Sequence, residues 1–419
     1  MYHRIGSNTL TMRIFPLYRT AIISSSILKL CHGFRQSHVL QNPFSNCRHF
    51  HMTTTTSERF AKRKPKTFEE ENDDDESYDF LGEFASDYHS PVMVNECVEA
   101  LVSCSRTQSR IFVDGTLGGG GHSLAILQQL KPGDILFGCD VDPEAIETAS
   151  DRLKEFMGHD NLEKPLFIPV ESNFCNLATT LPIVLHPIHN SPIITDGVDG
   201  ILLDLGVSSH QIDTAERGFA FLRDGPLDMR MDKNKANGIT AADILNVFSQ
   251  EEIKQILKNY GDEARARAIS ESIVEHRPFV STQDLVKAVA AVVPEFAKSR
   301  RMGRSATLAR VFQSLRIVVN REDEALQGAL LNMCPKLVRQ GGRLVVLSYH
   351  SLEDRATKRV IRDGMLGIRP TANERDMYGN YIGKPRPWKG LGKATKATAE
   401  EVTKNSRARS ATLRVAERI

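Results

Sequence analysis

The ten residues from Asp114 to Ser123 read DGTLGGGGHS and constrain the fold more than any other segment of this chain. Four consecutive glycines are disfavoured inside a helix or strand, because ordered glycine loses more backbone entropy than any other residue. They favour a tight turn at which the backbone approaches a ligand closely. An apolar run, Ile111–Asp114, precedes the turn, and leucines at helical spacing follow it as far as Leu130. Strand, glycine turn and helix together predict the first unit of a nucleotide-binding α/β fold, with a plain tight turn as the alternative.

The glycine turn departs from two common nucleotide motifs. A dinucleotide-binding GxGxxG motif that begins at Gly118 and Gly120 would need a third glycine where this chain has Ser123. A phosphate-binding GxxxxGK[ST] motif is also absent. The turn therefore favours a ligand other than a dinucleotide or a nucleoside polyphosphate.

Acidic and aromatic residues follow the next strands. Three further strands are predicted, at 135–140, 166–170 and 198–204. The first ends in Asp140, the second is followed by Phe174, and the third ends in Asp204. An acid about 20 residues after the turn can accept hydrogen bonds from the ribose of an adenosine. Because ligands of open α/β sheets bind at the carboxyl ends of the strands, these side chains should converge there. Acids without a phosphate-binding lysine predict a cationic adenosine cofactor such as S-adenosylmethionine.

Several long segments resemble the RsmH/MraW family of bacterial enzymes. They are DGTLGGGGHS at 114–123, DGILLDLGVSSHQ at 199–211, ERGF at 216–219 and GPLDMRMD at 225–232, with shorter matches at 89–93, 260–263, 348–355 and 405–410. The resemblance runs from about His89 to Arg418. Enzymes of this family use S-adenosylmethionine to methylate the N4 amine of a cytidine in small-subunit (16S-type) ribosomal RNA.

The resemblance implies a fold and a set of cofactor contacts. The fold is a class I (Rossmann-like) S-adenosylmethionine-dependent methyltransferase, an α/β fold, with an inserted helical domain. The implied cofactor-binding residues are Gly120, Gly121, His122, Asp140, Phe174, Asp204 and Gln211. One departure is His210, which stands where the bacterial pattern usually has proline and can alter the pose of Gln211.

Asp204 is also the catalytic candidate. The DNA amino-methyltransferase motif (D/N/S)PP(Y/F) is replaced here by the residues Asp204 to Val207. We expect Asp204 to accept a hydrogen bond from the N4 amine and to help remove its proton. Ser208, Ser209 and His350 are further candidates for orienting the base.

About 130 residues separate Asp204 from the next clear strand, Arg343–Ser348. The helices predicted between them are 241–248, 250–260, 263–276, 282–292 and 307–320. We predict two parts of a methyltransferase domain, 88–211 and 304–419, around an inserted substrate-binding helical domain at 212–303. A last strand is predicted at 411–416.

The net charge of +2 combines opposed segments of the chain. An acidic run at 69–76 offsets basic stretches near 298–321 and after Lys384. Basic residues around a concave site attract RNA phosphates. The candidate RNA contacts are Arg301, Arg304, Arg407 and Arg409, whereas Arg316 and Arg321 fit a solvated helix face equally well.

The first 57 residues contain six lysines or arginines and no acidic residue, which is typical of an organellar transit peptide. Residues 58–87 form a predicted acidic linker. We expect an organellar member of the family, in the mitochondrial matrix or alternatively the plastid stroma. The seven cysteines include no CxxC pair, so neither a disulfide framework nor a metal site is expected. Apolar runs are too short for a membrane span.

The sequence therefore predicts an S-adenosylmethionine-dependent rRNA (cytosine-N4-)-methyltransferase that acts in ribosome biogenesis. Its expected partner is small-subunit rRNA or the small ribosomal subunit, and a homodimer stays open. One alternative is a non-catalytic small-subunit assembly factor with the same fold. A methyltransferase of proteins or small molecules is disfavoured by the basic stretches.

Overall fold

The computed structural model describes residues 91–103, 109–157, 164–232, 238–296, 302–366, 377–378 and 386–419. All of them belong to one of the two units into which the chain divides, Phe80–Ile419. The predicted transit peptide, the predicted acidic linker and Arg301 lie outside the described residues.

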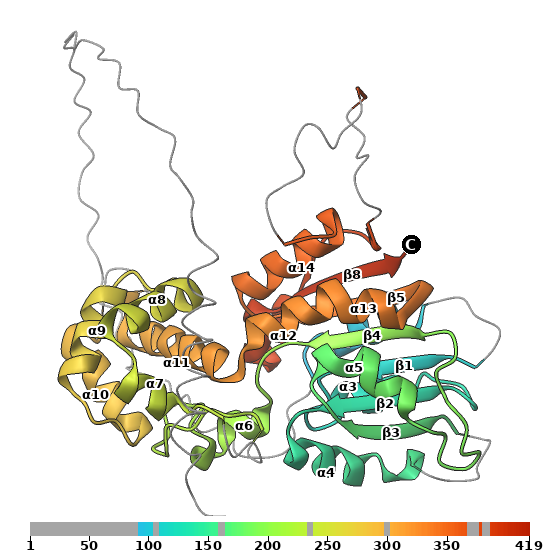
Figure 1. Cartoon of the computed structure of the whole chain (residues 1–419), viewed down its shortest axis with the longest axis horizontal. Helices are drawn as coiled ribbons and strands as arrows, with labels where there is room; N and C mark the ends of the chain where they lie inside the picture. The colour runs from blue at the N-terminus through green and yellow to red at the C-terminus, as the bar shows by residue number, and fades with distance from the viewer. Residues whose placement is uncertain are drawn as a thin grey trace, which may run out of the picture. The chain divides into compact units, whose positions relative to one another are not determined.

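Eight strands form one sheet in the order β3-β2-β1-β4-β5-β8-β6, with β7 paired to β8 (Figure 1). Their bounds are β1 Ile111–Asp114, β2 Ile135–Asp140, β3 Leu166–Glu171, β4 Val198–Asp204, β5 Val338–Ser348, β6 Trp388–Gly390, β7 Thr395–Lys396 and β8 Thr412–Arg418. Strands β1 to β5 pair in parallel, whereas β8 is antiparallel to β5. This is the predicted Rossmann-like class I methyltransferase fold. The strand order reverses between β1 and β4, where open α/β sheets bind their ligands.

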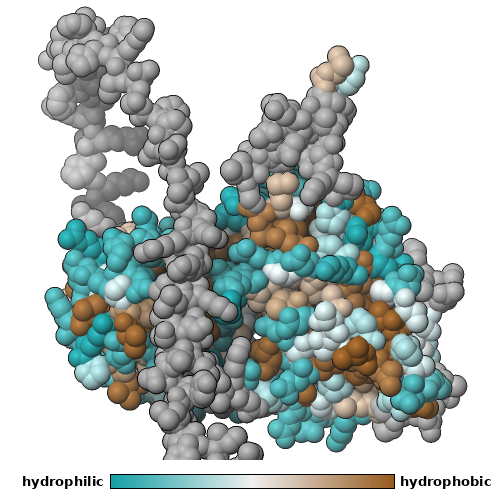
Figure 2. Space-filling model, in the orientation of Figure 1, coloured by the Kyte–Doolittle hydropathy of each residue, from teal (hydrophilic) through white to brown (hydrophobic). Residues whose placement is uncertain are grey.

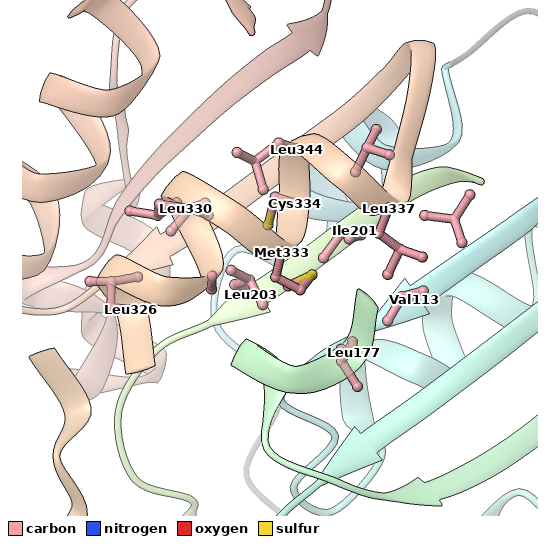
Figure 3. Packing of buried hydrophobic residues seen from close by; sticks show 14 of the residues in the cluster. Val113, Leu177, Ile201, Leu203, Leu326, Leu330, Met333, Cys334, Leu337 and Leu344 are labelled. Carbon is pink, nitrogen blue, oxygen red and sulfur yellow. The ribbon is translucent and has the colours of Figure 1, made fainter. Parts of the chain in front are cut away.

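The central strands are buried on both faces, which explains why they read as continuous apolar runs. In β4, Ile201 and Leu203 pack in one hydrophobic cluster with Val113 of β1 (Figure 3). Leu202 lies between them in sequence and packs in the other cluster with Phe112. The period of two residues thus places alternate side chains on opposite faces of the sheet.

Helices cover both faces. Helices α2 Val94–Val102, α3 Gly121–Leu127 and α4 Pro143–Arg152 contribute to one cluster. Helices α5 Leu177–Thr180, α12 Glu322–Gly328, α13 Cys334–Leu337 and α14 Ser351–Asp363 contribute to the other, together with the π-helical turn η6 Ala329–Met333. Trp388 of β6 is 2% exposed and packs in this second cluster.

The chain between β4 and α12 forms a second group of helices, which pack on one another. They are α7 Ala241–Val247, α8 Gln250–Gly261, α9 Ala266–Glu275, α10 Thr282–Val292 and α11 Arg304–Asn320. Capping boxes start α7 at Thr240, α8 at Ser249 and α10 at Ser281, which satisfies backbone N–H groups at those ends. Figure 2 shows a mostly hydrophilic surface with separate apolar spots over this group.

Each of the five predicted helices appears in this group. Helix α11 packs on α8, α7 and α10, although the predicted division assigns its residues to the second part of the methyltransferase domain. The domain boundaries stay a prediction. None of the described helices has the length and apolar character to cross a membrane.

Candidate active site

The glycine turn brings backbone amides to the carboxyl end of β2. Gly118 has a φ of +48°, a left-handed conformation that favours glycine. Its N–H donates to Asp140 Oδ2 over 2.9 Å. The turn is thereby fixed to the acid that was predicted to hold the ribose.

The next two glycines have packing reasons of their own. Gly120 has a φ of +74°, and a Cβ there would lie 3.2 Å from the Ala149 Cβ of α4. A Cβ at Gly121 would lie 3.3 Å from Pro91. The left-handed φ of Gly120 and these close approaches favour glycine even without a ligand, so the cofactor contacts predicted for Gly120 and Gly121 stay predictions.

Asp114, at the end of β1, binds the glycine turn through hydrogen bonds to its carboxylate. It is 1% exposed, and its carboxylate accepts hydrogen bonds from Ser123 Oγ at 2.7 Å and from the Thr116 N–H at 3.2 Å. Burial raises the pKa of Asp114, which these bonds and His122 partly oppose. Thr116 Oγ1 in turn accepts from the Asp204 N–H at 2.7 Å. Sequence reasoning assigned Asp114 no role, although its place at a strand end was visible.

Asp140 accepts backbone hydrogen bonds with both carboxylate oxygens. Besides the Gly118 contact, Oδ1 accepts from the Asp142 N–H at 3.0 Å. Burial nevertheless raises the pKa of Asp140 to about 6. Each oxygen has a second lone pair, so the carboxylate keeps capacity for hydroxyl donors.

Gln211 has both ends of its side chain engaged within the protein. It is 4% exposed, its Oε1 accepts from the Ser208 N–H at 3.1 Å, and its Nε2 donates to Asp142 Oδ2 at 3.0 Å. Ser208 Oγ accepts from the Gln211 N–H at 3.2 Å, so the two residues form the capping box of α6 Ser209–Asp213. The structure therefore shows a direct role for Gln211 in joining α6 to α4, while its cofactor contact stays a prediction.

Ser208 lies beside the glycine turn. A Cβ at Gly118 would be 3.7 Å from Ser208 Cβ. The side chain of Ser209 lies outside the described part of the structure. His210, the departure from the bacterial pattern, is exposed, and its Nε2 lies 3.4 Å from Glu144 Oε2. The capping box of α6 is formed in its presence.

Arg217 is a buried cation that sequence reasoning did not assign to the site. Its Nη1 lies 2.8 Å from Asp142 Oδ2 and 2.9 Å from Glu144 Oε2. Its Nη2 donates to the carbonyl oxygens of Arg230 at 3.1 Å and Met231 at 2.8 Å. The segments ERGF and GPLDMRMD, noted only as motifs, thus meet at this guanidinium.

Asp204, at the end of β4, has one oxygen in a buried contact and one without a partner. Its Oδ2 lies 3.4 Å from His122 Nδ1. Its Oδ1 is buried and has no hydrogen-bond partner among the described residues. Burial raises the pKa of Asp204 to about 6, whereas His122 and the Tyr349 hydroxyl lower it. Burial and the adjacent Asp204 also raise the pKa of Tyr349.

His350 follows Tyr349 and caps α14. Its Nε2 lies 2.8 Å from Glu353 Oε1, and Glu353 Oε2 accepts from the Tyr349 N–H at 2.8 Å. Burial opposes ionisation of Glu353, but the contacts with His350 and the charge of Arg316 hold its pKa below the usual value. The predicted base-orienting residue therefore contacts an ionised carboxylate, but neither of its buried ring nitrogens has a hydrogen-bond partner among the described residues.

Phe174 begins the 3-10 turn η2 Phe174–Asn176 and lies against the glycine turn. A Cβ at Gly115 would be 3.4 Å from Phe174 Cβ. The side chain is partly buried against the second hydrophobic cluster. The ring thus lies at the predicted edge of the sheet, and its adenine contact stays a prediction.

The predicted RNA contacts occupy different surroundings. Arg407, in η8 Ser406–Ser410, has a guanidinium nitrogen 3.9 Å from Asp213 Oδ2, and burial lowers its pKa despite the opposing effects of Asp213 and Tyr349. Arg409 is exposed. Arg304 Nε donates to the Val293 carbonyl at 3.3 Å and so lies within the helical group.

Arg316 and Arg321, for which the sequence favoured a solvated helix face equally, differ in their exposure. Arg316 forms a two-bonded pair with Glu322, with distances of 2.8 and 2.9 Å, and its side chain is only 13% exposed. Arg321 contacts Glu324 and is 64% exposed. Only Arg321 therefore fits a solvated face. Within the described ranges, no group of three or more His, Cys, Asp and Glu residues could hold a metal ion.

Comparisons with known proteins show the family of this chain. A model of the MraW methylase family matches residues 86–419. The ribosomal RNA small subunit methyltransferase H of Thermotoga neapolitana is 43% identical over 331 residues, which cover 79% of this chain and 96% of that protein. The protein of the same name from Geobacter sulfurreducens is 42% identical and covers 79% of this chain and 99% of that protein.

Among solved structures, a putative rRNA-methylase from Clostridium thermocellum matches 79% of this chain and 100% of that chain, with 10% identity and a TM-score of 0.32. The fold rests on the strand order described above, not on this likeness. Given the family match over most of its length and the extent of identity to these relatives, the chain belongs to the MraW methylase family.

Proposed function

We propose that this protein transfers a methyl group from S-adenosylmethionine to the N4 amine of a cytidine in small-subunit ribosomal RNA. The observation that carries the proposal is Asp204 Oδ1, a buried acceptor without a partner among the described residues, at the point where the strand order reverses. The curated relatives named as small-subunit rRNA methyltransferases support the substrate class.

S-adenosylmethionine is the cofactor, and the residues present fit it. Gly118 turns the backbone toward Asp140, whose carboxylate has lone pairs left for the ribose hydroxyls. The turn from Gly115 to His122 contains no lysine or arginine, which suits a ligand without phosphate. When bound, the cofactor supplies an electrophilic methyl group on a positively charged sulfur.

Asp204 acts on the acceptor amine. The lone pair of the cytosine N4 is delocalised into the ring, so a hydrogen bond from N4–H to Asp204 Oδ1 orients and polarises the amine. The Asp204 carboxylate then receives the amine proton. The target base must leave its stack to reach a buried carboxylate, since a base within a helix is inaccessible. We assign the orientation of the base to His350, which contacts Glu353, and to Ser208, which lies beside the glycine turn.

Basic residues supply the attraction to the RNA backbone. Arg407, whose guanidinium lies 3.9 Å from Asp213 Oδ2, and the exposed Arg409 both belong to η8. Phosphate contacts of this kind position RNA without reading its sequence. We therefore assign Arg407 and Arg409 to RNA binding, with Arg304 and Arg301 as further predicted contacts.

We also propose that the protein acts in an organelle, in the mitochondrial matrix or in the plastid stroma. The acid-free, basic segment 1–57 supports this location. Fluorescent fusions of the full chain and of a chain that lacks residues 1–57 test it: only the full chain should enter the organelle. A homodimer stays a prediction, which light scattering of the purified protein tests.

The function is tested by comparing organellar small-subunit rRNA from cells with and without this protein. N4-methylcytidine should be present only in the first, and purified protein with S-adenosylmethionine should restore it on subunits from the second. Subunits that fail to mature while the modification is unchanged would favour a non-catalytic assembly factor. The Asp204→Asn variant separates the two, because an assembly factor would tolerate it.

A further inference from the structure

His122 was expected to contact the cofactor, but the structure places both of its ring nitrogens against the protein. The residue is 6% exposed. Its Nε2 lies 3.0 Å from the Val92 carbonyl oxygen. Because a carbonyl only accepts hydrogen bonds, Nε2 must carry the hydrogen.

The other nitrogen faces Asp204. Nδ1 lies 3.4 Å from Asp204 Oδ2. With the hydrogen on Nε2, a neutral ring has a lone pair on Nδ1, so two acceptors face each other. One additional proton between Nδ1 and Oδ2 would satisfy both atoms. The His122–Asp204 pair can therefore bind one proton in addition to the hydrogen on Nε2.

The carbonyl that sets this tautomer is itself held in place. Met93, the next residue after Val92, has a φ of +50°, and its N–H donates to Glu401 Oε1 at 2.5 Å. Glu401 belongs to α15 Ala399–Lys404, near the end of the chain. The segments before α2 and after β7 thus fix the orientation of the Val92 carbonyl.

Resting on the proposed function, we infer that His122 and Asp204 act as one proton-accepting pair, in which Asp204 contacts the substrate amine and His122 is a positioning residue. As the N4–CH₃ bond forms, the S–CH₃ electron pair stays on sulfur. The N4–H bond breaks, its electron pair remains on nitrogen, and the proton bonds to Asp204. The proton is then shared with Nδ1, and solvent removes it after product release.

Several other groups influence Asp204. Besides His122, they are the Tyr349 hydroxyl, which favours the negative charge of Asp204, and Asp114 and Glu353, which disfavour it; the thiol of Cys97 is neutral because burial and Asp204 raise its pKa. Burial, together with the acids, raises the pKa of Asp204 to about 6. Near neutral pH the Asp204 carboxylate is consequently ionised and able to accept a proton.

The test compares wild type with His122→Gln. The glutamine amide can keep the hydrogen bond to Val92 but leaves no acceptor opposite Asp204. The methylation rate is measured in single turnovers on small subunits from cells that lack the protein. At the plateau of its pH profile, this rate should fall about tenfold or more in His122→Gln. The acid limb of the rate profile should shift along the pH axis, because Asp204 loses the ring nitrogen with which it shares the proton. A purely structural role would reduce the rate equally at every pH and would overturn the inference.

Cofactor affinity and NMR give readouts besides activity. The Kd for S-adenosylmethionine of His122→Gln should stay within about twofold of wild type, and a loss above tenfold would make His122 a cofactor contact instead. In ¹⁵N-histidine spectra of the full chain at pH 7.5, His122 should show the Nε2–H form. The Nδ1 signal of His122 should change in Asp204→Asn, because Nδ1 then faces an amide, and this measurement also covers the case in which His122→Gln fails to fold.

These readouts separate the two proposals. If wild type methylates no RNA, the proposed function is wrong, but the NMR spectra still test the pair. If wild type methylates RNA and the rate profile of His122→Gln matches it, only the proton-accepting pair is wrong. An Nδ1–H form of His122 would also exclude the pair.

Discussion

Arg217 Nη1 lies 2.8 Å from Asp142 Oδ2, and the two side chains are 1% and 2% exposed. Asp142 caps α4 and also accepts from Gln211, so one carboxylate joins α4 to α6 and to the turn that contains Arg217. The same guanidinium holds the backbone at Met231, whose N–H donates to Asn320 of α11 over 2.8 Å. The cofactor side of the sheet and the helical group are thus connected through a single buried cation.

Arg217→Met should destabilise the fold strongly. The change leaves the buried Asp142 carboxylate without its cation, and breaking a buried ion pair typically costs about 3–5 kcal/mol. Urea denaturation at pH 7 measures the loss. Arg267→Ala removes an arginine that is 81% exposed and pairs with Glu271 on a helix surface, and it should cost at most about 0.5 kcal/mol. Equal stabilities of the two variants would show that the Arg217 cluster contributes nothing special.

Asp140→Asn should weaken cofactor binding. The amide cannot accept from the ribose hydroxyls and the Gly118 N–H as a carboxylate does, and a charged hydrogen bond is worth about 1.5–3 kcal/mol. We expect the Kd for S-adenosylmethionine to rise about 10- to 100-fold in calorimetry. Wild-type affinity should also decrease below pH 6, where Asp140 becomes protonated. Asp196→Asn, at an exposed position before β4, is the matched control. Unchanged affinity in Asp140→Asn would exclude the ribose contact.

Asp204→Asn should abolish methylation yet stabilise the cofactor-free protein at neutral pH. The pKa of Asp204 rises from 3.8 to about 6 on folding, so the folded state disfavours the carboxylate. The penalty is absent below pH 3.8, grows between pH 3.8 and 6, and is constant above pH 6. Allowing for the 23% exposed side chain, the variant should gain about 1–2 kcal/mol at pH 7.5.

Denaturant unfolding of the cofactor-free protein at pH 4 and pH 7.5 measures this difference. The gain should be nearly absent at pH 4, where Asp204 is protonated in the folded state and partly protonated in the unfolded chain. A variant that is less stable than wild type at pH 7.5 would show that the Asp204 charge stabilises the fold.

The strand positions and the site edge were predictable because local patterns determine them. β1, β2 and β4 are mostly buried apolar runs and β3 is a partly buried one, and the predicted bounds agree within one residue at each end. The acids Asp140 and Asp204 follow from their places at strand ends, since parallel strands bring those ends to one edge. Motif segments indicated Arg217 and Tyr349 but gave them no role.

The remaining features depend on contacts between distant residues. The contact of His122 with Asp204 joins residues 82 positions apart, and nothing in either segment indicates that the histidine lies behind the carboxylate. The basic stretch around Arg310 and Arg316 suggested RNA contacts, but partners such as Glu263, 47 residues away, turn these arginines inward. The segment 322–337 has no continuous helical pattern because a π-helical turn interrupts it.

RNA binding should depend on Arg407 and Arg409 through their charge. Each phosphate contact contributes about one unit to the dependence of log affinity on log salt concentration, so Arg409→Ala should reduce that slope by about 1. Arg407→Ala should do the same and also slow methylation, because Arg407 lies near Tyr349 and its guanidinium is partly buried. Filter binding of small-subunit rRNA at several salt concentrations measures the slope. Lys131→Ala, an exposed change at the amino end of β2, should leave affinity and slope unchanged. If all three variants lose affinity equally, the attraction comes from net charge and not from this surface.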